Sequence, residues 1–194
     1  MLIVFEGGEG CGKTTQAERL YQYFLKQGKK VILTREPGGT KNAELLRQLL
    51  LKGQCEEWLP YSEFFLLLAA RVDHYEKHIK PHLDQGYIVI CDRFLLSTLV
   101  YQGHGRGLDI QWMKKIHADV FKTLTIDKTF VFLLSPTIAL SRVRKHQTFE
   151  DLGLAFHQTI YQGYKALGKE FDMIDVEDKK EDQVFKEIVG RLNV

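Results

Sequence analysis

A glycine-rich stretch near the N-terminus constrains the fold more than any other part of the chain. It reads Gly7-Gly8-Glu9-Gly10-Cys11-Gly12-Lys13-Thr14-Thr15 and fits Gly-x-x-x-x-Gly-Lys-Ser/Thr, a pattern typical of loops that bind nucleotide phosphates. An apolar run at residues 2–5 precedes the loop, and apolar residues at helical spacing follow it over residues 16–26. Because the pattern requires a strand before it and a helix after it, we interpret residues 7–14 as a phosphate-binding loop.

The residue types of this loop match its chemical task. Glycines let the backbone approach a polyphosphate closely, so that successive N–H groups and the positive end of the following helix face the anion. Lys13 adds a mobile positive charge, and Thr14 adds a hydroxyl group for Mg²⁺. The loop predicts nucleotide binding and leaves open which nucleotide chemistry it serves.

The composition is that of an ordinary globular chain, because 44% of its 194 residues are hydrophobic and 27% are charged. This length predicts one domain over residues 1–194. The net charge is only +2 and both signs are mixed along the chain, so we expect no nucleic-acid partner. No leader segment precedes the first strand and no apolar run is long enough to span a bilayer, which predicts a cytoplasmic protein without a membrane partner.

Three cysteines, Cys11, Cys55 and Cys91, are widely spaced and form no Cys-x-x-Cys pair. This spacing argues against a disulfide framework and against a zinc site. We expect Cys11 and Cys91 to be small packing residues.

Strands and helices alternate along the rest of the chain. Apolar runs predict four more strands, at residues 31–34, 87–93, 130–134 and 173–176. Helical spacing predicts helices at residues 40–52, 61–83, 109–122, 136–146, 152–169 and 180–192. This alternation predicts a three-layer α/β fold, in which helices flank a parallel, doubly wound sheet of five strands.

Charged residues follow the second of these strands. Arg35 and Glu36 stand at its carboxyl end, before Pro37-Gly38-Gly39, which is where open α/β sheets place ligand contacts. The residue pattern alone leaves an ordinary loop as an equal alternative. On the following helix, Glu44 and Arg47 lie three residues apart on one face, as in a solvated ion pair.

The helix at residues 61–83 begins with a stretch that is apolar nearly all round, which predicts that it is buried, in part against a second subunit. Arg71 ends this apolar run, and Leu67 lies one turn earlier on the same face. A flat apolar ring packed on Leu67 would therefore place its polar edge at Arg71. The structural alternative is an arginine whose charged end reaches solvent from a core helix.

An acid and an arginine end the third strand. Asp92 closes a continuous apolar run, which is the pattern of the aspartate that organises Mg²⁺ in phosphate-loop proteins. Arg93 beside it puts a charge at a buried strand end, where it needs a partner, and a substrate phosphate is a suitable one.

A basic segment, Ser141-Arg142-Val143-Arg144-Lys145-His146, precedes polar residues that continue to position 153. Most basic clusters are solvated surface. Here the cluster also fits a helical lid, at about residues 142–153, that closes over phosphates.

Five motifs, taken together and in order, resemble the bacterial form of the thymidylate kinase family over essentially the whole chain. They are FEGGEGCGKTT, TREPGGT, LLLAAR, CDRFLLSTLVYQGHGRG and the late basic lid. The resemblance implies transfer of the γ-phosphate of ATP to dTMP, giving dTDP and ADP, with Mg²⁺, in dTTP biosynthesis. It also implies a phosphate-loop kinase fold and a homodimer.

The resemblance further assigns roles to single residues. ATP would be bound by Gly7, Gly8, Glu9, Gly10, Cys11, Gly12, Lys13, Thr14 and Thr15, and Mg²⁺ would be organised by Thr14 and Asp92. The dTMP phosphate would meet Arg35, Arg47 and Arg93, with Glu36 beside them, and Glu9 would meet the sugar 3′-hydroxyl group. Thymine would pack on Leu67 and be read by Arg71, Thr98 and Gln102, and Tyr101 would pack on the deoxyribose.

Catalysis would then rest on alignment and charge. The dTMP phosphate is largely ionised at neutral pH, since its second pKa lies near ~6, so the attack needs no general base. Lys13, Arg93, the metal organised by Asp92 and a lid arginine would offset the repulsion between two anions. Because the phosphate loop carries no arginine, we predict that Arg142 or Arg144 supplies the lid charge.

Two positions depart from the family pattern. Leu67 stands where the family usually has phenylalanine, so an aliphatic contact replaces ring stacking on thymine, which predicts weaker base affinity or broader specificity. Gln147-Thr148-Phe149-Glu150 stands where bacterial members have Asp-Arg-x-Glu, so one expected lid arginine is absent.

Three alternatives to a selective dTMP kinase remain open. One is a kinase that accepts dUMP as well as dTMP. A nucleotide-dependent switch is the alternative from another class, although the sequence contains neither the Asp-x-x-Gly nor the Asn-Lys-x-Asp motif of GTPases. An inactive homologue is disfavoured by the intact Lys13, Thr14, Asp92 and Arg93.

Overall fold

The computed structural model describes residues 1–51, 57–142 and 153–192. Its single sheet has five parallel strands in the order β2-β3-β1-β4-β5. The strands are β1 Leu2–Gly7, β2 Val31–Arg35, β3 Ile88–Asp92, β4 Lys128–Leu133 and β5 Asp172–Asp175. The chain starts at the central strand, fills one half of the sheet and then crosses to the other half, which confirms the doubly wound α/β fold.

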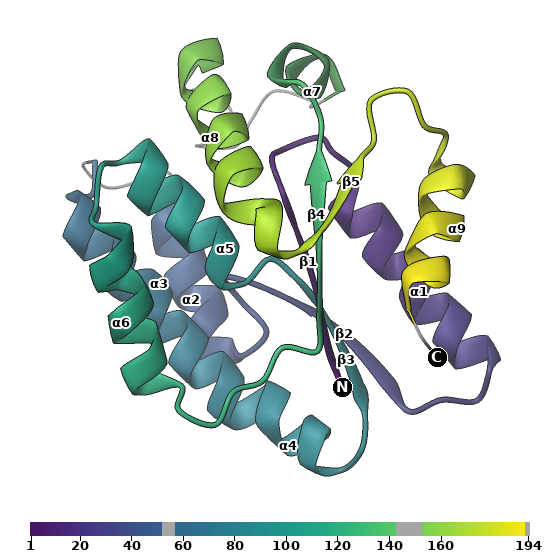
Figure 1. The fold of residues 1–194 in the computed structure, drawn as a ribbon. Helices are drawn as coiled ribbons and strands as arrows, with labels where there is room; N and C mark the ends of the chain where they lie inside the picture. The colour runs from purple at the N-terminus through teal and green to yellow at the C-terminus, as the bar shows by residue number, and fades with distance from the viewer. Residues whose placement is uncertain (52–56, 143–152, 193–194) are drawn as a thin grey trace.

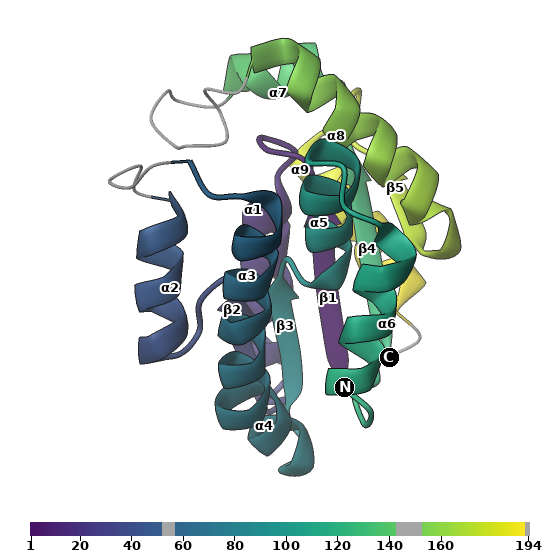
Figure 2. The ribbon, with the colours of Figure 1, turned by 90° about the vertical axis from the view of Figure 1, so that its left-hand side faces the viewer.

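Helices cover both faces of the sheet and complete three layers. Their bounds are α1 Lys13–Lys26, α2 Lys41–Leu51, α3 Pro60–His74, α4 Lys80–Asp84, α5 Leu95–Thr98, α6 Ile110–Val120, α7 Pro136–Arg142, α8 Gly153–Leu167 and α9 Glu181–Arg191. In Figure 1, α1 and α9 lie on one side of the sheet, and α3, α4, α5 and α6 lie on the other. Figure 2 views the sheet from this second side.

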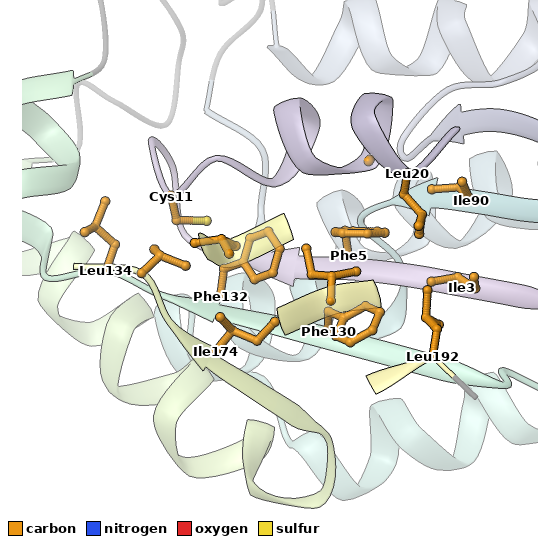
Figure 3. Close-up of a cluster of buried hydrophobic side chains, with 14 of the residues drawn as sticks. Ile3, Phe5, Cys11, Leu20, Ile90, Phe130, Phe132, Leu134, Ile174 and Leu192 are labelled. Atoms are coloured by element: carbon orange, nitrogen blue, oxygen red, sulfur yellow. The ribbon is translucent and has the colours of Figure 1, made fainter. Parts of the chain in front are cut away.

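Alternate residues of β1 contribute to two cores. Ile3 and Phe5 point to the side of α1 and α9, where the Phe5 ring lies 5.6 Å from the ring of Phe130 (Figure 3). Leu2 and Val4 belong to the core on the opposite side. Because both faces of this central strand are covered, its sequence is a continuous apolar run.

The helix expected at residues 61–83 consists of α3, a π-helical segment at Tyr75–Ile79 and α4. Phe64 in α3 is buried, whereas Tyr61 and Phe65 are 56% and 50% exposed. A single chain therefore buries only part of this helix, and the expected burial of the rest against a second subunit stays a prediction. Only one side of α3 faces the core, and Trp112 of α6 contacts the edges of the two exposed rings.

A helical segment after β3 was not expected from the sequence. It comprises α5 and a π-helix at Leu99–Gly105. β-branched residues and glycines give this stretch a low helix propensity, so packing stabilises it, with Val100 and Tyr101 in a buried cluster together with Ile160 and Tyr164 of α8.

The cysteines behave as packing residues where the structure describes them. Cys11 and Cys91 are buried free thiols, as expected, and Cys55 lies outside the described residues. Within the described ranges, no helix has both the length and the apolar character needed to cross a bilayer.

Candidate active site

The phosphate loop leads from β1 into α1 at the carboxyl edge of the sheet (Figure 1). Gly7 has a φ of 143°, and a Cβ atom there would lie 2.5 Å from the carbonyl oxygen of Phe132. Lys13 is buried, and its ammonium group donates to the Gly8 carbonyl oxygen at 2.6 Å. The loop therefore has the tight, glycine-dependent backbone that lets successive N–H groups face an anion.

Thr14, in the first turn of α1, meets Asp92 at the end of β3. The Thr14 hydroxyl group donates to Asp92 Oδ2 at 2.5 Å, while Asp92 Oδ1 is buried without a hydrogen-bond partner among the described residues. Mg²⁺ usually takes one or two protein ligands and completes its shell with water and nucleotide phosphates. An unpaired carboxylate oxygen beside a hydroxyl group fits the protein part of such a site.

Arg93 is the first residue after β3 and has a backbone φ of 70°, which is uncommon for a residue other than glycine. Its guanidinium group lies 2.6 Å from Glu9 Oε1 and also donates to the Gly7 carbonyl, to Ser97 and to the Tyr164 hydroxyl group. The expected strand end at Arg93 is thus wrong by one residue, since β3 ends at Asp92. The guanidinium charge of Arg93 has a partner, as the sequence predicted, and the carboxylate that pairs with it is Glu9.

Glu9 is an ionised acceptor at the edge of the phosphate loop. Burial alone would raise the pKa of its carboxyl group, but the charges of Arg93 and Lys13 outweigh burial and lower the pKa to about 2. The Tyr101 hydroxyl group donates to Glu9 at 3.2 Å, and the Tyr101 ring lies 5.4 Å from the guanidinium of Arg93. Glu9 therefore stays ionised at neutral pH and can accept a hydrogen bond from a hydroxyl group of a ligand.

Two arginines stand near the turn that follows β2. Arg35 is 55% exposed and donates to Glu44 at 3.2 Å, and Glu44 also accepts from the Gly39 N–H group. Arg47 donates to the Pro37 carbonyl oxygen at 2.8 Å. Glu44 therefore pairs with Arg35, and the ion pair between Glu44 and Arg47 that was the structural alternative is not among the contacts of the described residues.

Arg71 is 4% exposed and is held from two sides. Its Nε donates to Glu36 Oε2 at 2.5 Å, and its Nη2 donates to Thr98 Oγ1 at 2.9 Å. The other oxygen of Glu36 lies 3.1 Å from Nδ1 of the buried His74. This geometry contradicts the alternative of an arginine that reaches solvent. Since a guanidinium group has five N–H donors, Arg71 keeps donors for a ligand.

One cleft of about 440 Å³ brings the predicted site residues together. All those expected to contact dTMP line it, namely Glu9, Arg35, Glu36, Arg47, Leu67, Arg71, Arg93, Thr98, Tyr101 and Gln102. Lys13, Thr14 and Asp92 line the same cleft, so the phosphate loop opens directly into it. The role of each residue in this cleft stays a prediction.

Several lining residues were missed by sequence reasoning. They are Pro37, Leu50, Leu51, Glu63, Phe94 and Ser97. Glu63 could have been identified from the sequence, because a carboxylate within an apolar helix needs a partner when it is buried. Ser97 carried none, since the helix that contains it was not expected.

The predicted lid falls mostly on residues 143–152, which lie outside the described residues together with Arg144. Arg142, the last residue of α7, is exposed and is not one of the described residues that line the cleft.

The sheet order, the phosphate loop after β1 and the adjoining cleft with its arginines define a phosphate-loop nucleotide kinase. The sequence model of the family described as "Thymidylate kinase" matches residues 5–188. The chain belongs to the thymidylate kinase family.

Individual relatives agree with this membership. The chain is 42% identical over 176 residues to a thymidylate kinase from Magnetococcus marinus. The aligned residues cover 87% of this chain and 82% of the relative. It is 39% identical over 199 residues to one from Wolbachia sp. subsp. Brugia malayi, covering 99% and 95% of the two chains. The crystal structure of thymidylate kinase from Ehrlichia chaffeensis superposes with a TM-score of 0.80 at 32% identity and covers 100% of this chain and 98% of that one.

Proposed function

We propose that this protein transfers the γ-phosphate of ATP to dTMP by direct in-line attack, giving dTDP and ADP in dTTP biosynthesis. The observation that carries the proposal is the continuous cleft that joins Lys13 of the phosphate loop to the guanidinium groups of Arg47 and Arg71. ATP would occupy the loop end, and dTMP would occupy the end lined by Leu67 and Arg71. The acceptor phosphate would then lie between the two, beside Arg93.

Each part of the cleft would act on one part of the reacting pair. Lys13 and the loop N–H groups would hold the ATP phosphates, and Arg35, Arg47 and Arg93 would hold the acceptor phosphate. Mg²⁺, bound through Thr14 and Asp92, would neutralise charge on the transferred group. Because the attacking oxygen is already ionised, the protein has to align two anions and does not have to remove a proton.

The sugar and the base would be held on the far side of the acceptor phosphate. Glu9 would accept a hydrogen bond from the 3′-hydroxyl group, and the Tyr101 ring would pack on the deoxyribose. The base would lie on Leu67, with its polar edge toward Arg71, Thr98 and Gln102.

Turnover with a panel of acceptors tests this proposal. Coupled release of ADP is measured with Mg-ATP and, in turn, dTMP, dUMP, dCMP, dGMP and AMP. Selective turnover of dTMP is the expected result. Comparable turnover of several acceptors would favour a broader nucleoside monophosphate kinase, and ADP release without any acceptor would favour a nucleotide-dependent switch.

Replacing Leu67 by phenylalanine is expected to tighten dTMP binding by about two- to tenfold, because an aromatic ring stacks on a pyrimidine more favourably than an aliphatic chain does. Leu67 is half-buried and lines the cleft, so a ring there faces the site. Calorimetric titration with dTMP measures the change. Leu67→Met is the control of similar volume and is expected to bind like the parent protein. Weaker binding by the phenylalanine variant would contradict the assigned base position.

Alanine variants of Arg142 and Arg144 are expected to lose two or more orders of magnitude in kcat, because a lid arginine would stabilise the charge on the moving phosphoryl group. Steady-state ADP release at saturating substrates measures the loss. Lys145→Ala is the matched control from the same basic segment. Near-normal kcat in both arginine variants would refute the lid assignment.

We also propose that the protein works as a cytoplasmic homodimer. Leu59, which precedes α3, is 73% exposed, and Tyr61 and Phe65 in its first turns are 56% and 50% exposed. Trp112 of α6 lies against the rings of Tyr61 and Phe65. An exposed apolar group of this kind is typical of a subunit interface.

A further inference from the structure

Glu63 is a carboxylate enclosed in the apolar part of α3. Its side chain is 3% exposed, and its two oxygens have different partners. Oε1 accepts from Gln102 Nε2 at 2.7 Å, and Oε2 lies 3.2 Å from Arg106 Nη2. Arg106 also pairs with Glu57, whose side chain is 75% exposed. Glu63 and Gln102 both line the cleft.

This contact determines which end of the Gln102 amide faces a ligand. A side-chain amide has a donor end and an acceptor end of nearly the same shape, so its neighbours decide its orientation. An ionised carboxylate only accepts hydrogen bonds, and therefore the NH₂ end of Gln102 must point to Glu63. Gln102 is 2% exposed and lines the cleft, and within the described part of the chain its amide oxygen accepts no hydrogen bond, which leaves it available as an acceptor for a ligand there.

Arg106 supports the ionised form of Glu63. Burial raises the pKa of the Glu63 carboxyl group, and the charge of Arg106 opposes this rise. A protonated Glu63 would have a hydrogen to donate, and the Gln102 amide could then turn over. The arginine thus helps to keep Glu63 a pure acceptor.

We propose that Glu63 is the positioning residue that makes this cleft select a base with a C4 carbonyl and an N3–H group over cytosine. The inference rests on the proposed function and deepens it. Thymine and uracil would present the carbonyl oxygen to the N–H donors of Arg71 and the N3–H group to the amide oxygen of Gln102. Cytosine reverses both groups, because it carries an amino donor at C4 and an acceptor at N3.

The free-energy cost of this mismatch explains why the orientation of the Gln102 amide affects discrimination against cytosine. With cytosine, two donors would face each other at Arg71 and two acceptors would face each other at Gln102, and all of these groups would be shielded from water. A site built for defined hydrogen bonds rejects a ligand that leaves its buried groups unpaired. If the Gln102 amide were free to turn over, it could donate to N3 of cytosine, and one of the two mismatches would disappear.

The decisive quantity is the ratio of kcat/KM for dTMP to kcat/KM for dCMP, measured on the same preparation. Glu63→Gln keeps the shape of the side chain but offers both a donor and an acceptor, so we expect the ratio to fall at least about tenfold. Glu63→Asp keeps an acceptor-only group and is expected to retain most of the ratio. Glu57→Gln removes the other carboxylate near Arg106 and is the matched control, with an unchanged ratio.

Two further variants, Gln102→Met and the double variant that adds Glu63→Gln, separate positioning from general damage to the cleft. Gln102→Met removes the amide, and Glu63→Gln added to it should lower the ratio no further if Glu63 acts through Gln102. Because both substrates are compared in one sample, a loss of folded protein cancels from the ratio.

Two results would overturn the inference: Glu63→Gln keeps the parent ratio, or Glu63→Gln lowers the ratio as much in the Gln102→Met background as in the parent. Absence of dTMP turnover by the parent protein would instead refute the proposed function, so the two failures are distinguishable.

Discussion

The Lys13→Met variant is expected to lose about three orders of magnitude or more in kcat while remaining folded. Lys13 is 5% exposed and places its ammonium group over the phosphate loop, 2.6 Å from the Gly8 carbonyl oxygen. Methionine fills a similar volume without the charge, so the packing at the start of α1 survives and the attraction for phosphate is lost. Steady-state ADP release with dTMP measures kcat, and thermal unfolding reports on the fold.

Lys26→Met is the matched control, because Lys26 is an exposed lysine in the last turn of the same helix. It is expected to keep the parent kcat. A Lys13→Met protein that retained a tenth or more of the parent kcat would show that this lysine does not hold the reacting phosphates.

The Arg93→Gln variant should combine a loss of kcat of about three orders of magnitude with a measurable loss of stability. The guanidinium group neutralises Glu9 and donates to the Gly7 carbonyl and to Ser97, so its removal leaves buried polar groups without partners. Such unpaired groups cost about 1–3 kcal/mol. Kinetics well below the unfolding temperature separates the catalytic loss from the loss of stability.

Two further variants define what Arg93 contributes. Arg93→Lys keeps the charge without the forked donors, so it should recover only part of kcat. Arg19→Lys changes an arginine of α1 that pairs with Asp182 in α9, and it should retain the parent kcat. A near-normal kcat for Arg93→Gln would contradict both the phosphate contact and the role assigned to this strand end.

The fold was largely predictable because its strands are buried on both faces. Continuous apolar runs such as residues 2–5 mark parallel strands, and the glycines between positions 7 and 12 mark the loop between the first strand and the first helix. The residues of the cleft were also predictable as a group. Arg35 and Asp92 each end a strand, and the carboxyl ends of parallel strands lie at one edge of the sheet.

The contacts inside the cleft were not predictable, because they join residues far apart in the sequence. The pairs of Glu9 with Arg93 and of Glu36 with Arg71 span 84 and 35 positions. A sequence shows that a buried charge needs a partner and does not show which one. The sequence predicted that α3 is apolar nearly all round, but it did not show which side faces the core, because an apolar helix has the same composition whether its second side meets the core or another subunit.

Phosphorus NMR spectroscopy of the protein with Mg-ATP, recorded with and without dTMP, tests the central claim most directly. Direct transfer predicts that the signals of ADP and dTDP grow in equal amounts only when dTMP is present, without inorganic phosphate. Release of inorganic phosphate in place of dTDP, or an unchanged spectrum with dTMP, would contradict the assignment of this cleft as the site of phosphoryl transfer between the two nucleotides.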